Sequence, residues 1–218
     1  MKELTKHIYV FSGLGADERV FQKMDFNGLT VTFINWEKPN KKETIEEYAN
    51  KLLRQIKIEK PIIVGLSFGG IMAIEIAKQI DTEKVILIAS AKTKTEIPLY
   101  YRLAGKIKAH KLLSSSFLKK SNFLSNWFFG VSSIFEKELL KTILNDTDSN
   151  FLIWAIDKIV TWTNQTELKN IYHIHGTADK ILPICFVKSD YKVENGGHFM
   201  TLNKENELSK LIKKLVWL

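Results

Sequence analysis

Residues 62–70 read Ile-Ile-Val-Gly-Leu-Ser-Phe-Gly-Gly, and this stretch decides which fold the sequence predicts. Its three leading β-branched residues are typical of a buried strand, and the apolar pattern from Phe68 to Ile80 is typical of a helix. Gly65 and Gly69 stand two residues before and after Ser67, where a sharp turn between strand and helix leaves no room for side chains. The start of the helix also directs unpaired N–H groups toward Ser67. We therefore expect Ser67 to be a nucleophile on a strained turn.

The composition indicates one large globular domain, because the 218 residues are 45% hydrophobic and 26% charged. The net charge of +8 comes mainly from scattered lysines, without zinc-finger spacing or a helix-turn-helix pattern, so we expect no nucleic-acid partner. No apolar run reaches the ~18 residues of a membrane-spanning helix, and Ile8–Phe11 is too short for the core of a signal peptide. A single cysteine, Cys185, fits a reducing compartment, and we expect a cytoplasmic protein.

Strands and helices alternate on both sides of the central stretch. A capping box of Thr44 and Glu47 precedes a helix, and a last helix buries residues from Leu208 to Val216. Besides the strand that begins at Ile62, strands are expected at His7–Ser12, Leu29–Asn35, Val85–Ile88, Ile171–Ile174 and Tyr191–Val193. This alternation predicts a mainly parallel sheet covered by helices on both faces.

Residues 92–167 carry helical patterns and no convincing strand. Ser133 and Glu136 form a second capping box, and Asp148 is placed to cap a further helix. We therefore expect an α/β core formed by residues 1–91 and 168–218, with residues 92–167 as an inserted helical lid, called the insert below.

A serine nucleophile needs a base that is itself oriented by a carboxylate. His198 follows two glycines just past the last short strand, and Asp179 likewise follows a strand. The carboxyl ends of parallel strands are where such sheets build their sites, so we expect both side chains near Ser67. Two alternatives stay open: Asp179 as the cap of a turn, and Glu194 as the orienting acid.

Four motifs, each at the end of an expected strand, occur in the order of an α/β-hydrolase. They are Phe11–Asp17, Gly65–Gly70, His175–Pro183 and Gly196–Phe199. The sequence resembles the α/β-hydrolase superfamily over nearly its whole length, and specifically its short esterase-like members. The resemblance implies the α/β-hydrolase fold, with about six strands because the strands that begin longer members are missing.

The resemblance also implies a role for each matching residue. Ser67 would be the nucleophile, His198 the general base and then acid, and Asp179 the group that holds the imidazole. The backbone N–H groups of Leu14 and Phe68 would form the oxyanion hole. It implies a small-molecule acyl ester as substrate, and no cofactor or metal. Related sequences often carry a histidine where Ser12 stands, which leaves open how the loop Gly13-Leu14-Gly15, called the glycine loop below, is held.

The insert contains a basic stretch and then an uncharged aromatic one. The basic side chains are Lys92, Lys94, Arg102, Lys106, Lys108, Lys111, Lys119 and Lys120, with Glu96 as the single acid before Phe135. They fit a solvated helix face, or a rim that favours anionic or membrane-associated esters through weak contact with a membrane surface. Neutral and carboxylate-bearing esters that respond identically to added salt would exclude the rim. Within the uncharged stretch Ser121–Phe135, we expect Phe123, Trp127 and Phe128 to roof an apolar acyl pocket.

The sequence thus predicts a serine hydrolase that cleaves carboxylic esters or thioesters through an acyl-enzyme. The alternatives are a small-ligand-binding protein without catalysis on the same scaffold, and an acyltransferase or C–C hydrolase that uses the same residues. A metal site at His173, His175, Asp179 and Cys185 lacks zinc spacing. A dinucleotide site at the glycine loop has Glu18 where a third glycine belongs. The oligomeric state stays open.

Overall fold

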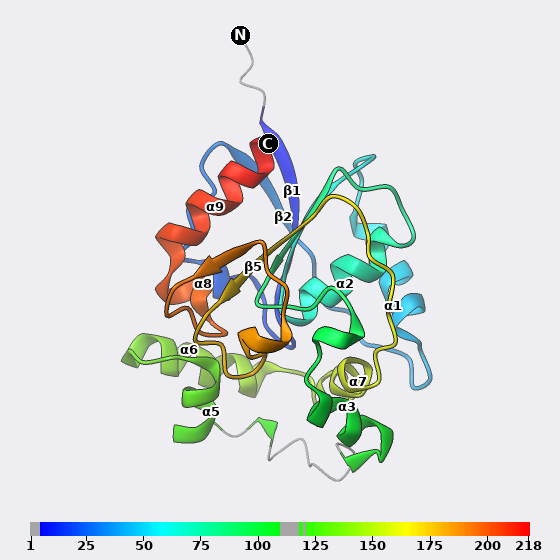
Figure 1. Ribbon diagram of the computed structural model, residues 1–218, viewed down its shortest axis with the longest axis vertical. Helices are drawn as coiled ribbons and strands as arrows, with labels where there is room; N and C mark the ends of the chain where they lie inside the picture. Colours follow the sequence, from blue (N-terminus) through cyan, green and yellow to red (C-terminus); the bar gives the residue numbers. More distant parts are fainter. Residues whose placement is uncertain (1–4, 110–117, 120) are drawn as a thin grey trace.

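Six strands form one sheet in which every ladder is parallel (Figure 1). The strands are β1 (Lys6–Phe11), β2 (Leu29–Phe33), β3 (Ile62–Leu66), β4 (Lys84–Ile88), β5 (Ile171–Gly176) and β6 (Tyr191–Val193). Their order across the sheet is β2-β1-β3-β4-β5-β6, so β3, which leads into Ser67, lies inside the sheet. The expected six-stranded parallel sheet is confirmed.

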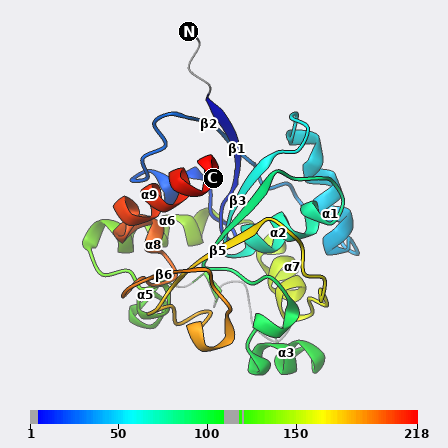
Figure 2. The same ribbon diagram turned by 45° about the horizontal axis from the view of Figure 1, so that its top comes forward.

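Both faces of the sheet are buried, because successive side chains of each strand point to opposite faces. In β1, Ile8 and Val10 belong to one apolar cluster, while Tyr9 and Phe11 belong to the other. The first cluster packs under α6 (Ile134–Asp146), α8 (Met200–Asn203) and α9 (Glu205–Trp217). The second packs under α1 (Ile45–Leu52), α2 (Phe68–Ala77) and α7 (Ser149–Val160). Figures 1 and 2 show these two sets of helices on opposite sides of the sheet.

The helices begin where the capping patterns predict. Capping boxes are formed by Thr44 with Glu47 before α1 and by Ser133 with Glu136 before α6. The carboxylate of Asp148 accepts hydrogen bonds from two backbone N–H groups at the start of α7. The remaining helical elements are α3 (Leu99–Lys106), α5 (Phe123–Phe129) and the short 3₁₀ turns η1 (Glu18–Phe21), η2 (Leu53–Gln55), η3 (Lys94–Glu96) and η5 (Ile184–Phe186).

The insert lies at the carboxyl end of the sheet (Figure 1). Its helix α6 contributes Leu140 and Ile143 to the first apolar cluster, and α7 contributes Phe151 and Trp154 to the second. Helix α3 rests on α7 at Gly105, where a Cβ atom would lie 2.4 Å from the carbonyl oxygen of residue 160. The insert therefore shares its packing with the core on both faces of the sheet.

The computed structural model describes residues 5–109, 118–119 and 121–218. The start of the chain before residue 5, and His110, Lys111 and Lys120 of the basic stretch, lie outside the described residues. Within the described ranges, no helix combines the length and the apolar character needed to cross a membrane.

Candidate active site

Ser67 occupies a sharp turn between β3 and α2, with φ 53° and ψ −118°. This conformation is costly for a residue with a side chain and persists only where its surroundings enforce it. A Cβ atom at Gly65 would lie 2.4 Å from the carbonyl oxygen of Gly69, and one at Gly69 would lie 2.3 Å from that of Ser12. The backbone N–H of Ser67 donates to the carbonyl of Ile88, 2.8 Å away. The two glycines therefore let three segments close around the turn.

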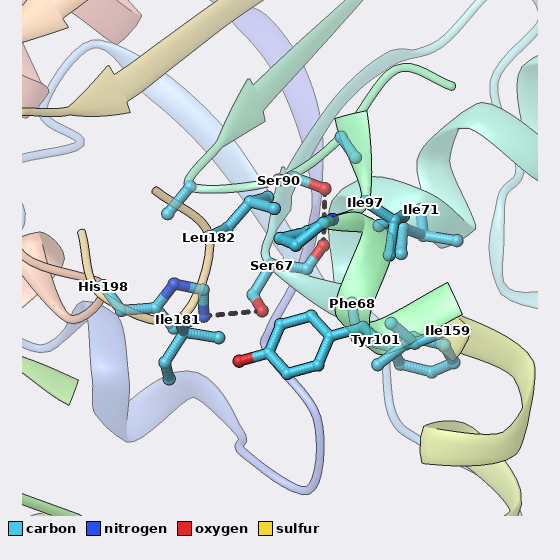
Figure 3. A pocket seen from close by; sticks show the side chains of 13 residues that line it. Ser67, Phe68, Ile71, Ser90, Ile97, Tyr101, Ile159, Ile181, Leu182 and His198 are labelled. Atoms are coloured by element: carbon cyan, nitrogen blue, oxygen red, sulfur yellow. Dashed lines mark hydrogen bonds between the residues drawn. The ribbon is translucent and has the colours of Figure 1, made fainter. Parts of the chain in front are cut away.

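The structure brings the predicted serine, histidine and aspartate together. His198 Nε2 lies 2.8 Å from Ser67 Oγ (Figure 3), and His198 Nδ1 lies 2.8 Å from Asp179 Oδ2. The second carboxylate oxygen, Oδ1, accepts the backbone N–H groups of Ile181 and Leu182, each at 2.9 Å. Asp179 thus caps its turn with one carboxylate oxygen and contacts the imidazole of His198 with the other, so capping the turn does not prevent contact with the imidazole.

The electrostatics favour a charged carboxylate at Asp179. Burial raises its pKa, but the charge and hydrogen bond of His198 and the N–H of Leu182 outweigh this and hold the pKa below its usual value. His175 Nε2 lies 2.7 Å from the Leu182 carbonyl, to which it donates, and 3.6 Å from Asp179 Oδ2. Burial lowers the pKa of His175 despite the nearby Asp179. Glu194, the rival acid, is exposed and instead accepts a hydrogen bond from Thr177.

Residues 194–199, called the histidine loop below, rest against α5 of the insert. The backbone N–H of Phe199 donates to the carbonyl of Phe129 at 3.0 Å. Gly130 ends α5 with φ +69°, and a Cβ atom there would lie 3.0 Å from Gly197 Cα. The rings of Phe129 and His198 meet edge to face with centroids 6.0 Å apart. The insert therefore helps to place the imidazole.

The glycine loop is held by a serine and a tryptophan. Ser12 Oγ donates to the Ala16 carbonyl at 2.6 Å and accepts the indole N–H of Trp36 at 3.0 Å. The same indole N–H lies 3.2 Å from the carbonyl oxygen of Gly13. These contacts explain how the loop keeps its shape with serine at position 12. Trp36 could not be predicted from sequence, because it lies 24 residues from Ser12 along the chain.

The insert clamps the other end of this loop. Thr147 Oγ1 donates to the carbonyl oxygens of Gly15 at 3.0 Å and Ile143 at 2.7 Å. Gly15 has φ +66°, and a Cβ atom there would lie 2.3 Å from Thr147 Oγ1. Among the described residues, the backbone N–H groups of Leu14 and Phe68 donate to no acceptor. Both amides therefore keep their hydrogen-bonding capacity unused.

A cavity of about 70 Å³ lies next to Ser67 and His198 (Figure 3). Its lining is almost entirely apolar and consists of Ser67, Phe68, Ile71, Ala89, Ser90, Ala91, Ile97, Pro98, Tyr101, Ile159, Ile181, Leu182 and His198. Ser90 Oγ donates to the carbonyl of Ser67 at 2.6 Å, which further secures the turn. The Tyr101 hydroxyl points toward Ser67 and His198 in Figure 3. Burial, together with Tyr100 and Asp179 nearby, raises the pKa of Tyr101 to about 12.

The structure places Phe123, Trp127 and Phe128 outside this lining. Phe123 is 85% exposed, and Trp127 packs on Phe128 and beneath the ammonium group of Lys180, 4.2 Å from its ring centre. The reason is that α5 packs on the histidine loop, whereas α3 and α7 supply the insert's share of the cavity wall. An uncharged aromatic stretch predicts that its side chains pack against other residues, but it does not predict which residues these are.

Sequence reasoning missed the lining residues that lie beyond the strand ends. Ala89, Ser90 and Ala91 follow β4 at the same edge of the sheet as Ser67, which was a usable signal. Tyr101 and Ile159 carried none, because their approach depends on how the insert folds back. Across the described ranges, histidine, cysteine and acidic side chains form no group of three or more suited to a metal ion.

No protein-family model matches the chain, and no curated protein sequence does. Among solved structures, an esterase from Exiguobacterium antarcticum is 16% identical with a TM-score of 0.71, covering 98% of this chain and 92% of that one. The 2-hydroxy-6-oxo-6-phenylhexa-2,4-dienoate hydrolase from Rhodococcus sp. strain RHA1 is also 16% identical, with a TM-score of 0.69, covering 100% and 92%.

A third similar structure comes from epoxide hydrolases of the alpha/beta hydrolase superfamily found in metagenomes from hot environments. It is 12% identical with a TM-score of 0.68, covering 98% of this chain and 91% of that one. The three proteins carry different activities in their names, so the likeness concerns architecture rather than the bond that is cleaved. This chain has the α/β-hydrolase fold.

Proposed function

We propose that this protein is a serine hydrolase that cleaves carboxylic esters or thioesters of small molecules through an acyl-enzyme, without a cofactor. The observation that carries the proposal is the 2.8 Å contact between Ser67 Oγ and His198 Nε2, continued by the 2.8 Å contact between His198 Nδ1 and Asp179. A serine hydroxyl becomes an effective nucleophile when an oriented imidazole takes its proton. Burial of His198 and Asp179 shields this chain of contacts from water.

In the first half of the reaction, Ser67 Oγ attacks the carbonyl carbon while its proton passes to His198 Nε2. The negative charge that develops on the carbonyl oxygen is met by the N–H groups of Leu14 and Phe68. The C–O or C–S bond then breaks, and the leaving alcohol or thiol takes the proton from His198. In the second half, water attacks the acyl-enzyme and gives a proton to His198, which returns it to Ser67 Oγ as the acid departs.

The division of the chain follows the same proposal. Residues 1–91 and 168–218 form the core that carries Ser67, Asp179, His198 and both amides. Residues 92–167 serve as the roof, because Ile97, Pro98, Tyr101 and Ile159 line the cavity from that side.

The two alternatives differ from this proposal in what happens at Ser67. A ligand-binding protein would use the cavity and leave Ser67 unmodified. An acyltransferase or C–C hydrolase would share Ser67 and His198 but pass the acyl group to another acceptor, or break a different bond. The unpaired amides of Leu14 and Phe68 favour catalysis over binding alone, because a neutral apolar ligand offers no acceptor for two N–H donors.

The test is hydrolysis of p-nitrophenyl esters by the wild-type protein and by Ser67→Ala. Because the serine and histidine act as a unit, we expect kcat to fall on the order of 10⁶-fold in this variant. Ser132→Ala is the matched control, since this serine is exposed and lies just before α6, and it should retain full activity. Ester hydrolysis that is unchanged in Ser67→Ala would contradict the proposal.

A further inference from the structure

The cavity beside Ser67 is bounded on one side by aliphatic side chains from separate elements. Figure 3 shows His198 and Ile181 on one side of Ser67 and Ile71, Ile97 and Ile159 on the other. Ile71 comes from α2 and Ile159 from α7, while Ile97 follows η3 and is almost fully buried. Ile71 and Ile97 belong to the apolar cluster between the sheet and α7, and Ile159 packs against that cluster. This wall is therefore part of the core.

The size of the cavity limits what it can hold. Its volume is about 70 Å³, and one water molecule needs roughly 10–15 Å³ of such space. The cavity thus holds roughly five to seven non-hydrogen atoms. When the carbonyl group and the adjoining ester atom are placed beside Ser67, the remaining room takes a short acyl chain and no more.

The polarity of the lining limits its chemistry further. Besides Ser67, the lining drawn from residues 5–109, 118–119 and 121–218 contains one serine, Ser90, whose hydroxyl donates to the Ser67 carbonyl. Tyr101 contributes a hydroxyl that points toward His198 (Figure 3), and burial and its neighbours raise its pKa to about 12, so it is protonated at neutral pH. Among the residues that the structure describes, no lysine, arginine, aspartate or glutamate lines the cavity. A charged acyl group would lose its water there without gaining a partner, which is strongly unfavourable.

We propose that the site takes esters or thioesters with a short, apolar, uncharged acyl chain of about two to four carbons beyond the carbonyl carbon, which fills the space bounded by Ile71, Ile97 and Ile159. This inference rests on the proposed function and adds the class of acyl group to it.

The first experiment measures kcat/KM of the wild-type protein for p-nitrophenyl acetate, butyrate, hexanoate and octanoate. We expect the highest values for acetate and butyrate and a value at least about tenfold lower for octanoate, because a long chain has no room beyond the three isoleucines. A value for octanoate equal to or above that for butyrate would overturn the inference.

The second experiment uses substitutions that enlarge the cavity and one that reduces it. Ile159→Ala removes three carbon atoms and should raise the octanoate-to-butyrate ratio of kcat/KM about tenfold, whereas Ile159→Phe should restrict hydrolysis to acetate. Ile153→Ala is the matched control, because Ile153 lies on the same helix, is 38% exposed and does not line the cavity. Ile97→Ala provides a second enlarged cavity that does not depend on α7. An unchanged chain-length profile in the folded enlarged variants would overturn the inference.

The proposed serine hydrolase activity and the proposed size of the acyl group can be tested separately. Reaction of a fluorophosphonate with Ser67 reports on the nucleophile alone. If Ser67 reacts but only long-chain esters are hydrolysed, the acyl class is wrong and the proposed function stands. If Ser67 does not react and no ester is hydrolysed, the proposed function fails and the acyl class fails with it.

Discussion

At the scale of single residues, the glycine loop depends on Trp36. Its indole N–H reaches both Ser12 Oγ and the Gly13 carbonyl, and Ser12 Oγ in turn holds the Ala16 carbonyl. The Leu14 amide lies between these anchors. Its direction relative to Ser67 therefore depends on a hydrogen bond from a side chain that does not line the cavity.

Trp36→Phe removes this hydrogen bond and keeps an aromatic ring in the same cluster. We expect kcat to fall about tenfold with little change in KM, because the Leu14 amide acts on the charge of the transition state. The measurement is steady-state hydrolysis of p-nitrophenyl butyrate. Trp154→Phe is the control, because its indole N–H bonds to the Glu43 carbonyl, away from the loop. An equal loss of kcat in both variants would show that Trp36 acts through packing alone.

At the scale of elements, α5 positions the histidine loop. Gly130 ends α5 in a left-handed conformation and lies directly against Gly197. The adjoining Phe129 carbonyl accepts the N–H of Phe199, and Asn203 Nδ2 donates to the Gly130 carbonyl at 3.2 Å. The segment just before His198 thus has no freedom to shift without moving the end of α5.

Gly130→Ala and Gly28→Ala separate backbone strain from displacement of the histidine loop. Both glycines have positive φ, +69° and +85°, but only Gly130 has a neighbour within 4 Å of the added methyl group. We expect urea unfolding to show a loss of about 1–2 kcal/mol in each variant. Only Gly130→Ala should also lose activity, by about tenfold or more in kcat, because its methyl group pushes on Gly197. Full activity in folded Gly130→Ala would mean that the end of α5 does not position His198.

At the scale of the whole molecule, stability is tied to neutral histidines inside the sheet. His173 is fully buried in β5, with its ring 5.3 Å from that of His175. Burial, together with His175 and Lys92 nearby, holds the pKa of His173 well below its usual value. The unfolded chain therefore takes up a proton at a higher pH than the folded chain. Stability is complete above the unfolded value of about 6.5 and is lost as the pH falls toward the folded value.

Replacement of His173 tests this dependence. Between about pH 7.5 and about pH 5.5, His173 should account for about 1.4 kcal/mol of the loss in unfolding free energy of the wild-type protein. His173→Leu should reduce the loss by that amount. Ile174→Val in the same strand carries no titratable group, so it should lower stability at both pH values and leave the difference unchanged. A pH dependence in His173→Leu equal to that of the wild type would contradict the account.

Much of the architecture could be predicted because its causes are local in sequence. The β-branched run before Ser67, the two flanking glycines and the capping boxes each act within a few residues. Asp179 and His198 were predictable because both follow strands of one parallel sheet, whose carboxyl ends share an edge. The cavity wall was not, since Ile71, Ile97 and Ile159 meet only after the insert folds back over the sheet. Phe123, Trp127 and Phe128 were expected there for their apolar character, which does not determine their neighbours.

The central claim concerns one hydroxyl group, and covalent trapping tests it most directly. A fluorophosphonate reacts with a serine only when a neighbouring base activates it. We expect one adduct per chain, located by peptide mass spectrometry at Ser67 and lost in both Ser67→Ala and His198→Ala. A wild-type protein that forms no adduct, or that carries the adduct on another residue, would contradict the account.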